Sequence, residues 1–124
     1  MAQLYRLEYK QKLTRREQLL ILEIGRDRID AASKFVDYIY DIYGISKSST
    51  WYLLNKLKEK GILDFASKDE IGKPLFLTKA GIAELSSIER QGLKNRLLEE
   101  FSTMYLQRAY AEGVVDEIGH IAIS

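Results

Sequence analysis

Apolar residues in this chain recur at three- and four-residue intervals over several segments, which polar turns or glycines separate. The first segment follows "TRRE", in which Thr14 and Glu17 have the spacing of a capping box, where each side chain bonds to the other residue's backbone N–H. Because the apolar run "EQLLILEIG" comes next, we predict a helix from about Thr14 to Gly25. The preceding residues 1–13 fit either an extended arm or a short helix.

Two further helices are predicted on either side of a tight turn. The segment "DAASKFVDYIYDIYG" has apolar residues at helical spacing, with Asp30 as the expected N-cap and Gly44 as the residue that ends the helix. Ser46 is the expected N-cap of the next helix, which runs to about Lys60 and stops at Gly61.

The segment "ILDFASKDEIGKPLFLT" predicts a β-hairpin. Ile62, Leu63 and Phe65 fit a short strand, and "SKDEIGK" fits a polar turn. The run "PLFL" fits a second short strand, with its proline confined to the start, where no ladder hydrogen bond is lost.

A long fourth helix is predicted after the hairpin, with Thr78 as its N-cap and Glu112 as its furthest extent. Gly92 is a point where it kinks or splits. Its apolar stripe is more than one small domain easily covers, so we expect it to pair with a second copy of the chain. The predicted dimer contacts are Leu85, Ile88, Leu97, Phe101, Met104 and Tyr105. The alternative is that the helix folds back on its own wing and hides the stripe within one chain.

The helix that begins after Ser46 has two unlike faces when residues are placed 100° apart. Its predicted core face consists of Thr50, Leu53, Leu54 and Leu57. Its predicted outward face consists of Ser48, Ser49, Tyr52, Asn55 and Lys56. Trp51 lies on a flank between the two faces, and we expect it to pack against the core rather than to contact a partner.

Composition limits the classes of function. The 124 residues are 46% hydrophobic and 30% charged, which suits one small globular unit. Because the chain has no cysteine and one histidine, we predict no disulfide, no metal site and no cofactor. It contains neither a nucleophile–base arrangement nor a phosphate-binding loop, so we do not expect an enzyme. With no bilayer-spanning apolar run and no signal peptide, we expect a cytoplasmic protein without a membrane partner.

Charge is unevenly distributed along the chain. The net charge is +1, but residues 1–83 carry 15 Lys and Arg against 11 Asp and Glu, whereas residues 84–124 carry 4 against 7. A basic front part with an acidic tail is expected when one part meets an anionic partner. Chance scatter over a mixed-charge surface would give the same counts.

The order of these elements resembles that of winged helix-turn-helix transcriptional regulators, above all the MarR and PadR groups. The resemblance is carried by "GISKSSTWYLLNKLKEKGIL" followed by "GKPLFLTKAG", and it covers about residues 13–85. It implies a mainly α fold with a small β-hairpin wing. It further implies a DNA-binding domain over residues 1–85 and a C-terminal helical dimerisation region over residues 86–124.

The resemblance and the outward face together predict that a homodimer binds double-stranded DNA and regulates transcription. The helix at about residues 46–60 would enter the major groove, and the wing at about 62–78 would lie near the backbone. Asn55 can pair with adenine, and lysines can meet phosphates. The predicted DNA-binding residues are Arg15, Arg16, Lys47, Ser48, Ser49, Tyr52, Asn55, Lys56, Lys68 and Lys73.

Two other readings stay open. A winged-helix module that binds another protein instead of DNA agrees with the modest net charge and with Asp69 and Glu70 at the wing tip. Regulators of this kind often bind a small-molecule effector between the core and the dimer helices. No set of residues in the sequence identifies such an effector.

Overall fold

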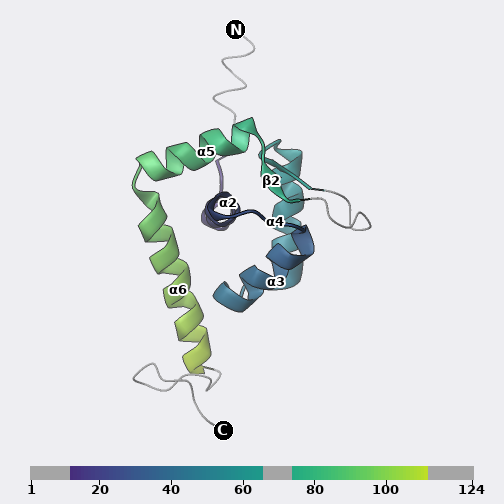
Figure 1. Cartoon of the computed structure of the whole chain (residues 1–124). Coiled ribbons are helices and arrows are strands. Elements are labelled where there is room, and N and C mark those ends of the chain that lie inside the picture. The colour runs from purple at the N-terminus through teal and green to yellow at the C-terminus, as the bar shows by residue number, and fades with distance from the viewer. Residues whose placement is uncertain (1–11, 66–73, 112–124) are drawn as a thin grey trace.

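The computed structural model describes residues 12–65 and 74–111, with side chains described as far as Thr103. Within these residues the protein is mainly helical, with one small antiparallel hairpin. Figure 1 shows helix α2 end-on at the centre, with α5 above it, α6 on the left, α4 on the right and α3 below. The core therefore forms around α2.

Helix α2 spans Arg15–Arg26 and is enclosed by the other elements. Four consecutive residues, Leu19 to Leu22, are buried, so this helix is apolar on all sides over more than one turn. The capping box predicted at its start is present: Glu17 N donates to Thr14 Oγ1 over 3.1 Å, and Thr14 N donates to Glu17 Oε1 over 2.9 Å.

Helices α3, Ala32–Tyr43, and α4, Lys47–Glu59, follow on either side of the predicted tight turn. Gly44 ends α3 in the left-handed conformation, as expected. The expected cap at Asp30 is wrong: Ala31 is the N-cap and makes no side-chain cap bond. Asp30 instead lies 3.5 Å from the Arg28 guanidinium, which draws its carboxylate away from the helix end.

The hairpin consists of β1, Leu63–Asp64, and β2, Phe76–Leu77, paired antiparallel with Leu63 opposite Leu77. A further bridge joins Leu75 to Ile29, whose carbonyl accepts from Leu75 N over 3.1 Å. The segment between α2 and α3 thus pairs with the hairpin, which the sequence pattern did not predict. The tip, including Lys68, Lys73, Asp69 and Glu70, lies outside the described residues.

The long fourth helix is two helices, α5, Lys79–Arg90, and α6, Leu93–Ala111. The break falls at Gly92, which has a φ of 68° and could not stay in a continuous helix. Thr78 caps α5 as predicted by accepting from Gly81 N over 3.2 Å.

Helix α6 turns back over the core, and this overturns the expectation that its apolar stripe is uncovered. Ile88, Leu97 and Phe101 are each at most 4% exposed within the single chain, and Leu85 packs against the same core. Phe101 meets Tyr43 of α3 edge to face, with ring centroids 6.4 Å apart. These four residues are thus covered within one chain, as the fold-back alternative expected, but α6 packs on α2, α3 and α5 rather than on the wing. The side chains of Met104 and Tyr105 lie outside the described part.

The expected division between residues 85 and 86 falls inside α5. Residues on both sides of it belong to one continuous cluster of buried side chains. The described helices accordingly pack as one unit around α2.

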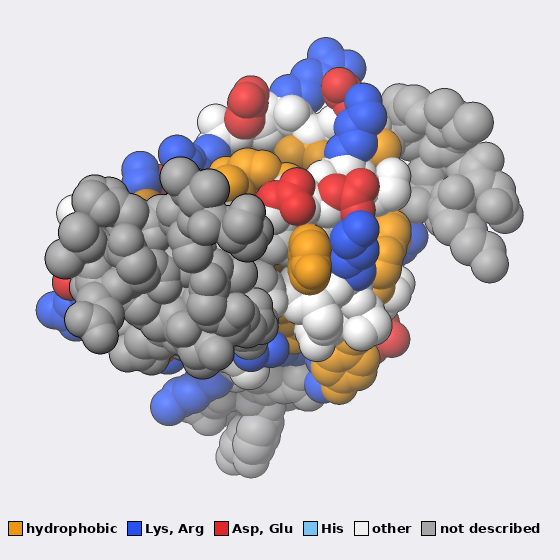
Figure 2. Space-filling view, turned by 90° about the horizontal axis from the view of Figure 1, so that it is seen from below, with side chains coloured by type: hydrophobic (Ala, Val, Ile, Leu, Met, Phe, Trp, Pro, Cys, Tyr) orange, Lys and Arg blue, Asp and Glu red, His pale blue; other side chains and the backbone are white. Residues whose placement is uncertain are grey.

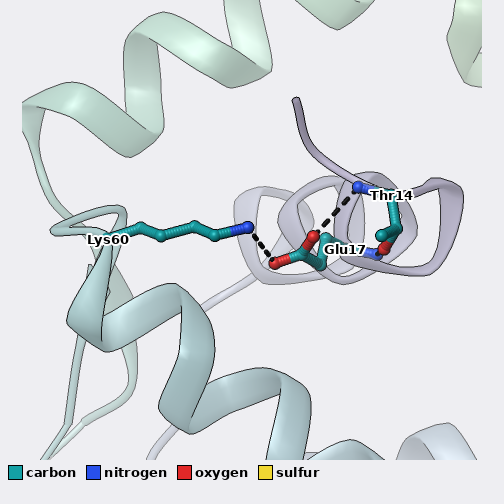
Figure 3. Close-up of polar contacts among 3 residues, drawn as sticks. All are labelled: Thr14, Glu17 and Lys60. Carbon is teal, nitrogen blue, oxygen red and sulfur yellow. Dashed lines mark hydrogen bonds and ion pairs between the residues drawn. The ribbon is translucent and has the colours of Figure 1, made fainter. Parts of the chain in front are cut away.

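A buried carboxylate joins the start of α2 to the end of α4. Glu17 is 1% exposed, and Lys60 Nζ donates to its Oε2 over 2.9 Å, as Figure 3 shows. Burial alone would raise the pKa of Glu17, but the hydrogen bonds from Lys60 and Thr14 and the lysine charge together lower it. The ionised form is therefore the one that the folded chain stabilises.

This carboxylate makes stability depend on pH. Because folding lowers the pKa of Glu17, its contribution is fully present above the ordinary value of 4.5 and is lost as the pH falls through the lower folded-state value. We expect Glu17→Gln to lower the free energy of unfolding at pH 7 by about 1–3 kcal/mol and to flatten its decline below pH 5. Urea unfolding followed by circular dichroism at pH 7 and pH 3 measures both effects. Glu59→Gln, which removes an exposed acid, is the control, and an equal loss in both variants would contradict the assignment.

A close backbone contact fixes the root of the hairpin against α5. A Cβ at Gly81 would lie 2.0 Å from the carbonyl oxygen of Ile62. We expect Gly81→Ala to lower the free energy of unfolding by about 1–3 kcal/mol, although alanine is the better helix former. Thermal unfolding compared with Ser86→Ala, at an exposed position of the same helix, tests this. Unchanged stability in Gly81→Ala would show that the backbone shifts without cost.

Candidate functional site

Helix α4 has the two faces that its sequence predicts. Thr50, Leu54 and Leu57 of the predicted core face are fully buried, whereas Leu53, the fourth residue of that face, is half-buried. Ser48, Tyr52, Asn55 and Lys56 are exposed, and Ser49 is half-buried. We call these five residues the outer face of α4. It is polar and hydrogen-bonding except for the Tyr52 ring, which is 60% exposed.

Hydroxyl groups organise the first turn of α4. Ser46 accepts from Ser49 N over 3.2 Å as the predicted N-cap, and its hydroxyl also donates to Ser49 Oγ over 2.7 Å. Thr50 fits the core because its hydroxyl donates to the carbonyl of Ser46 over 3.1 Å, so no buried donor is left unpaired. Ser48 keeps its hydroxyl on the exposed side, 3.4 Å from Ser46 Oγ.

Trp51 packs rather than faces solvent, as the sequence analysis favoured. Its ring lies 6.1 Å from that of Phe65, just beyond β1, in a tilted arrangement. Lys58 also contacts Phe65: its Nζ lies 4.6 Å from the centre of the Phe65 ring and donates to the Phe65 carbonyl oxygen over 2.7 Å. Trp51 therefore holds α4 against the root of the hairpin.

Several predicted contact residues already have partners within the chain. Lys47 Nζ lies 3.1 Å from Asp37 Oδ1 and 5.5 Å from the centre of the Tyr40 ring. Asn55 Nδ2 donates to the carbonyl of Trp51 over 3.0 Å, which uses one of the two N–H groups of its amide. Lys56 lies over the Tyr52 ring at 5.5 Å and has no carboxylate partner among the described residues. Lys56, the one cation of the outer face, is thus well placed to meet an anion.

The structure brings Arg15 and Arg16 to the start of the outer face. They line one open groove of about 600 Å³ together with Ser48, Ser49 and Tyr52. Its remaining walls include Glu100 and Phe101 of α6, and Arg15 Nε lies 2.6 Å from Glu100 Oε2. We call this the Arg15 groove. Nothing in the sequence indicated Glu100, because it lies 85 positions from Arg15 and belongs to no motif.

A second pocket, of about 390 Å³, lies where α2 ends and α3 begins. Its wall contains Glu23, which is 4% exposed and accepts from Arg26 over 2.8 Å and from the Tyr43 hydroxyl over 3.2 Å. Burial, and then the charge of Glu23, raises the pKa of Tyr43, so this phenol stays protonated. The pocket shares no lining residue with the Arg15 groove.

Charges of both signs are mixed on the surface. On the face shown in Figure 2, hydrophobic, basic and acidic side chains lie interspersed, and no broad area of one sign is present among the coloured residues. Within the described residues, no three potential metal-ligating side chains gather at one place. No helix in the described part of the chain has the length and apolar character needed to cross a bilayer.

Comparison with models of protein families, with curated proteins and with solved structures gave no match. Any function for this chain therefore has to be argued from its own residues and geometry.

Two neighbouring aromatic residues of α4 should behave differently when truncated. We expect Trp51→Ala to lower the free energy of unfolding by on the order of 2 kcal/mol, below the ~3–5 kcal/mol typical of a fully buried ring. Tyr52→Ala should change it by less than about 0.5 kcal/mol, because this ring is mostly exposed. Urea unfolding followed by circular dichroism compares the two variants. Equal losses would mean that Tyr52 is also a packing residue.

Proposed function

We propose that this protein is a sequence-specific regulator that binds double-stranded DNA, with α4 as the recognition helix and the β1–β2 hairpin as a wing beside the DNA backbone. One observation carries the proposal: α4 buries Thr50, Leu54 and Leu57 along one side and exposes hydroxyl, amide and ammonium groups along the other. The surrounding order of helix, helix, turn, helix and hairpin supports it, because this is the order in winged helix-turn-helix regulators.

The proposed contacts divide into those that read sequence and those that position the protein. The major groove is about 12 Å wide and admits a helix, and the small Ser48 side chain lets α4 approach the base edges. Asn55 can then form two hydrogen bonds to adenine through its Oδ1 and one amide N–H. Lys56 and Arg16 would meet phosphates, which hold the duplex in register without reading its sequence.

We further propose that two chains bind as a homodimer and present two α4 helices to half-sites about one helical turn apart. The described residues limit how such a dimer forms. Ile88, Leu97 and Phe101 are covered within one chain, and α6 shows polar side chains such as Lys94, Asn95 and Glu99 on its exposed side. A dimer contact through residues 86–103 would therefore have to be polar.

A second candidate function is a winged-helix module that binds another protein. The observation in its favour is that Lys47 and Arg15 are each paired with a carboxylate of the same chain, which weakens the attraction for phosphates. Exposed rings at Tyr40 and Tyr52 suit a protein partner as well. This candidate predicts that duplex DNA does not bind at near-physiological salt. A small-molecule effector stays a prediction, and the pocket beside Glu23 is one place to look for it.

Selection of bound sequences from random duplex DNA, followed by titration at several salt concentrations, tests the leading proposal. We expect Asn55→Ala to reduce discrimination between the selected and a scrambled site by about 1–3 kcal/mol. Lys56→Ala should instead weaken binding to both sites and reduce the slope of log affinity against log salt by about 1. Lys94→Ala, which removes an exposed lysine at the start of α6, is the matched control. If neither variant differs from this control, α4 is not the recognition helix.

A further inference from the structure

The ion pair between Arg15 and Glu100 joins α6 to the side of the molecule that carries the outer face of α4. Arg15 stands in the first turn of α2, and its Nε lies 2.6 Å from Glu100 Oε2. Both side chains line the Arg15 groove, where Ser48 and Tyr52 of α4 are also present. This contact between α2 and α6, in a groove that α4 also lines, links the C-terminal half of the chain to the proposed DNA interface.

The position of Glu100 is set by packing on both sides of it along α6. Leu97, one turn earlier, is fully buried, and the next residue, Phe101, is 4% exposed and meets the Tyr43 ring. The carboxylate is therefore carried by a helix that is anchored in the core. Local fraying of α6 alone therefore does not remove the Glu100 carboxylate from the groove.

Carboxylates and phosphates bind a guanidinium in the same way, through short charge-assisted hydrogen bonds. Glu100 thus occupies on Arg15 the place that a phosphate oxygen of a duplex would take. Its own charge also repels a phosphate that approaches Arg16 or the Ser48 hydroxyl in the same groove. The groove combines cationic and hydroxyl groups suited to a phosphodiester with one carboxylate that opposes it.

We propose that the Arg15 groove is a phosphodiester-binding subsite, and that Glu100 is an internal competitor for its Arg15 guanidinium. This inference rests on the proposed function, since the phosphodiester belongs to the DNA that α4 would read. Release of Arg15 from Glu100, by a shift of α6 or by competition from the phosphate itself, adds one cation to the interface. The position of α6 would thereby set how tightly DNA is held.

The competition is modest in strength, because the ion pair is partly open to solvent. The Arg15 and Glu100 side chains are 53% and 37% exposed, respectively, and exposed ion pairs hold their partners weakly. We therefore expect Glu100→Gln to raise DNA affinity by about threefold to tenfold at low salt, with a smaller gain at high salt. The gain should apply to selected and scrambled sites alike, because a phosphate contact does not read sequence.

The test titrates fluorescently labelled duplex DNA with the full chain at several salt concentrations. Glu99→Gln is the matched control: it removes the same charge from the neighbouring exposed residue of α6, which does not line the groove. Glu100→Gln should bind more tightly than Glu99→Gln, and its salt slope should be steeper by about 1. In an Arg15→Ala background the gain from Glu100→Gln should shrink to the part that comes from direct repulsion between the Glu100 charge and a phosphate. Glu100→Ala serves as a second variant, and circular dichroism verifies the fold of each.

Two results would overturn the inference while the proposed function stands. In the first, the wild-type protein binds DNA, and Glu100→Gln and Glu99→Gln bind it with equal affinity. The change in affinity would then come from net charge alone. The other is a gain that is equally large without Arg15. If neither the wild type nor Glu100→Gln binds any duplex at any salt concentration, the proposed function itself is wrong, and the subsite falls with it.

Discussion

The buried carboxylate of Glu17 is the constraint on which the placement of α4 depends. It caps the start of α2 by accepting a hydrogen bond from Thr14 N. It accepts a second hydrogen bond from Lys60, at the C-terminal end of α4. A charge inside a protein is costly unless it is paired, so the chain cannot move α4 away from α2 without leaving Glu17 alone. The ion pair adds a directional contact to the apolar packing of Leu54 and Leu57, which are fully buried.

The parts of the fold that the sequence predicted correctly are those decided within about four residues. Thr14 caps with Glu17 three positions on, Ser46 caps the start of α4, and Gly44 ends α3, because each of these interactions closes over a single helical turn. The buried side of α4 was equally predictable, since a helical repeat fixes which side chains share a face. The predicted cap at Asp30 was wrong, because its carboxylate lies beside the Arg28 guanidinium and not at the start of α3.

The parts that could not be predicted depend on pairs distant in sequence. A pattern shows that Leu97 and Phe101 share an apolar stripe, but it cannot show whether a second chain or the chain's own core covers that stripe. Gly92 decided the outcome, because a left-handed residue turns α6 back over α2 and α3. The same limit applies to the candidate site. The sequence predicted Arg15 as a DNA contact but gave no sign of Glu100, which reaches it from another helix.

The contacts within the chain also bear on how a DNA interface of this kind would discriminate between sites. Non-specific affinity grows with the number of cations that replace counterions on the phosphates. Lys47 and Arg15 are held by carboxylates, so fewer cations are available than the sequence displays. Base-edge contacts from a helix with small hydroxyl residues at its start are unaffected by that loss. Under the proposed function, the protein would therefore bind random DNA weakly, and direct readout would supply more of its affinity for a preferred site. The ratio of specific to non-specific affinity rises as a result, whereas the affinity itself does not.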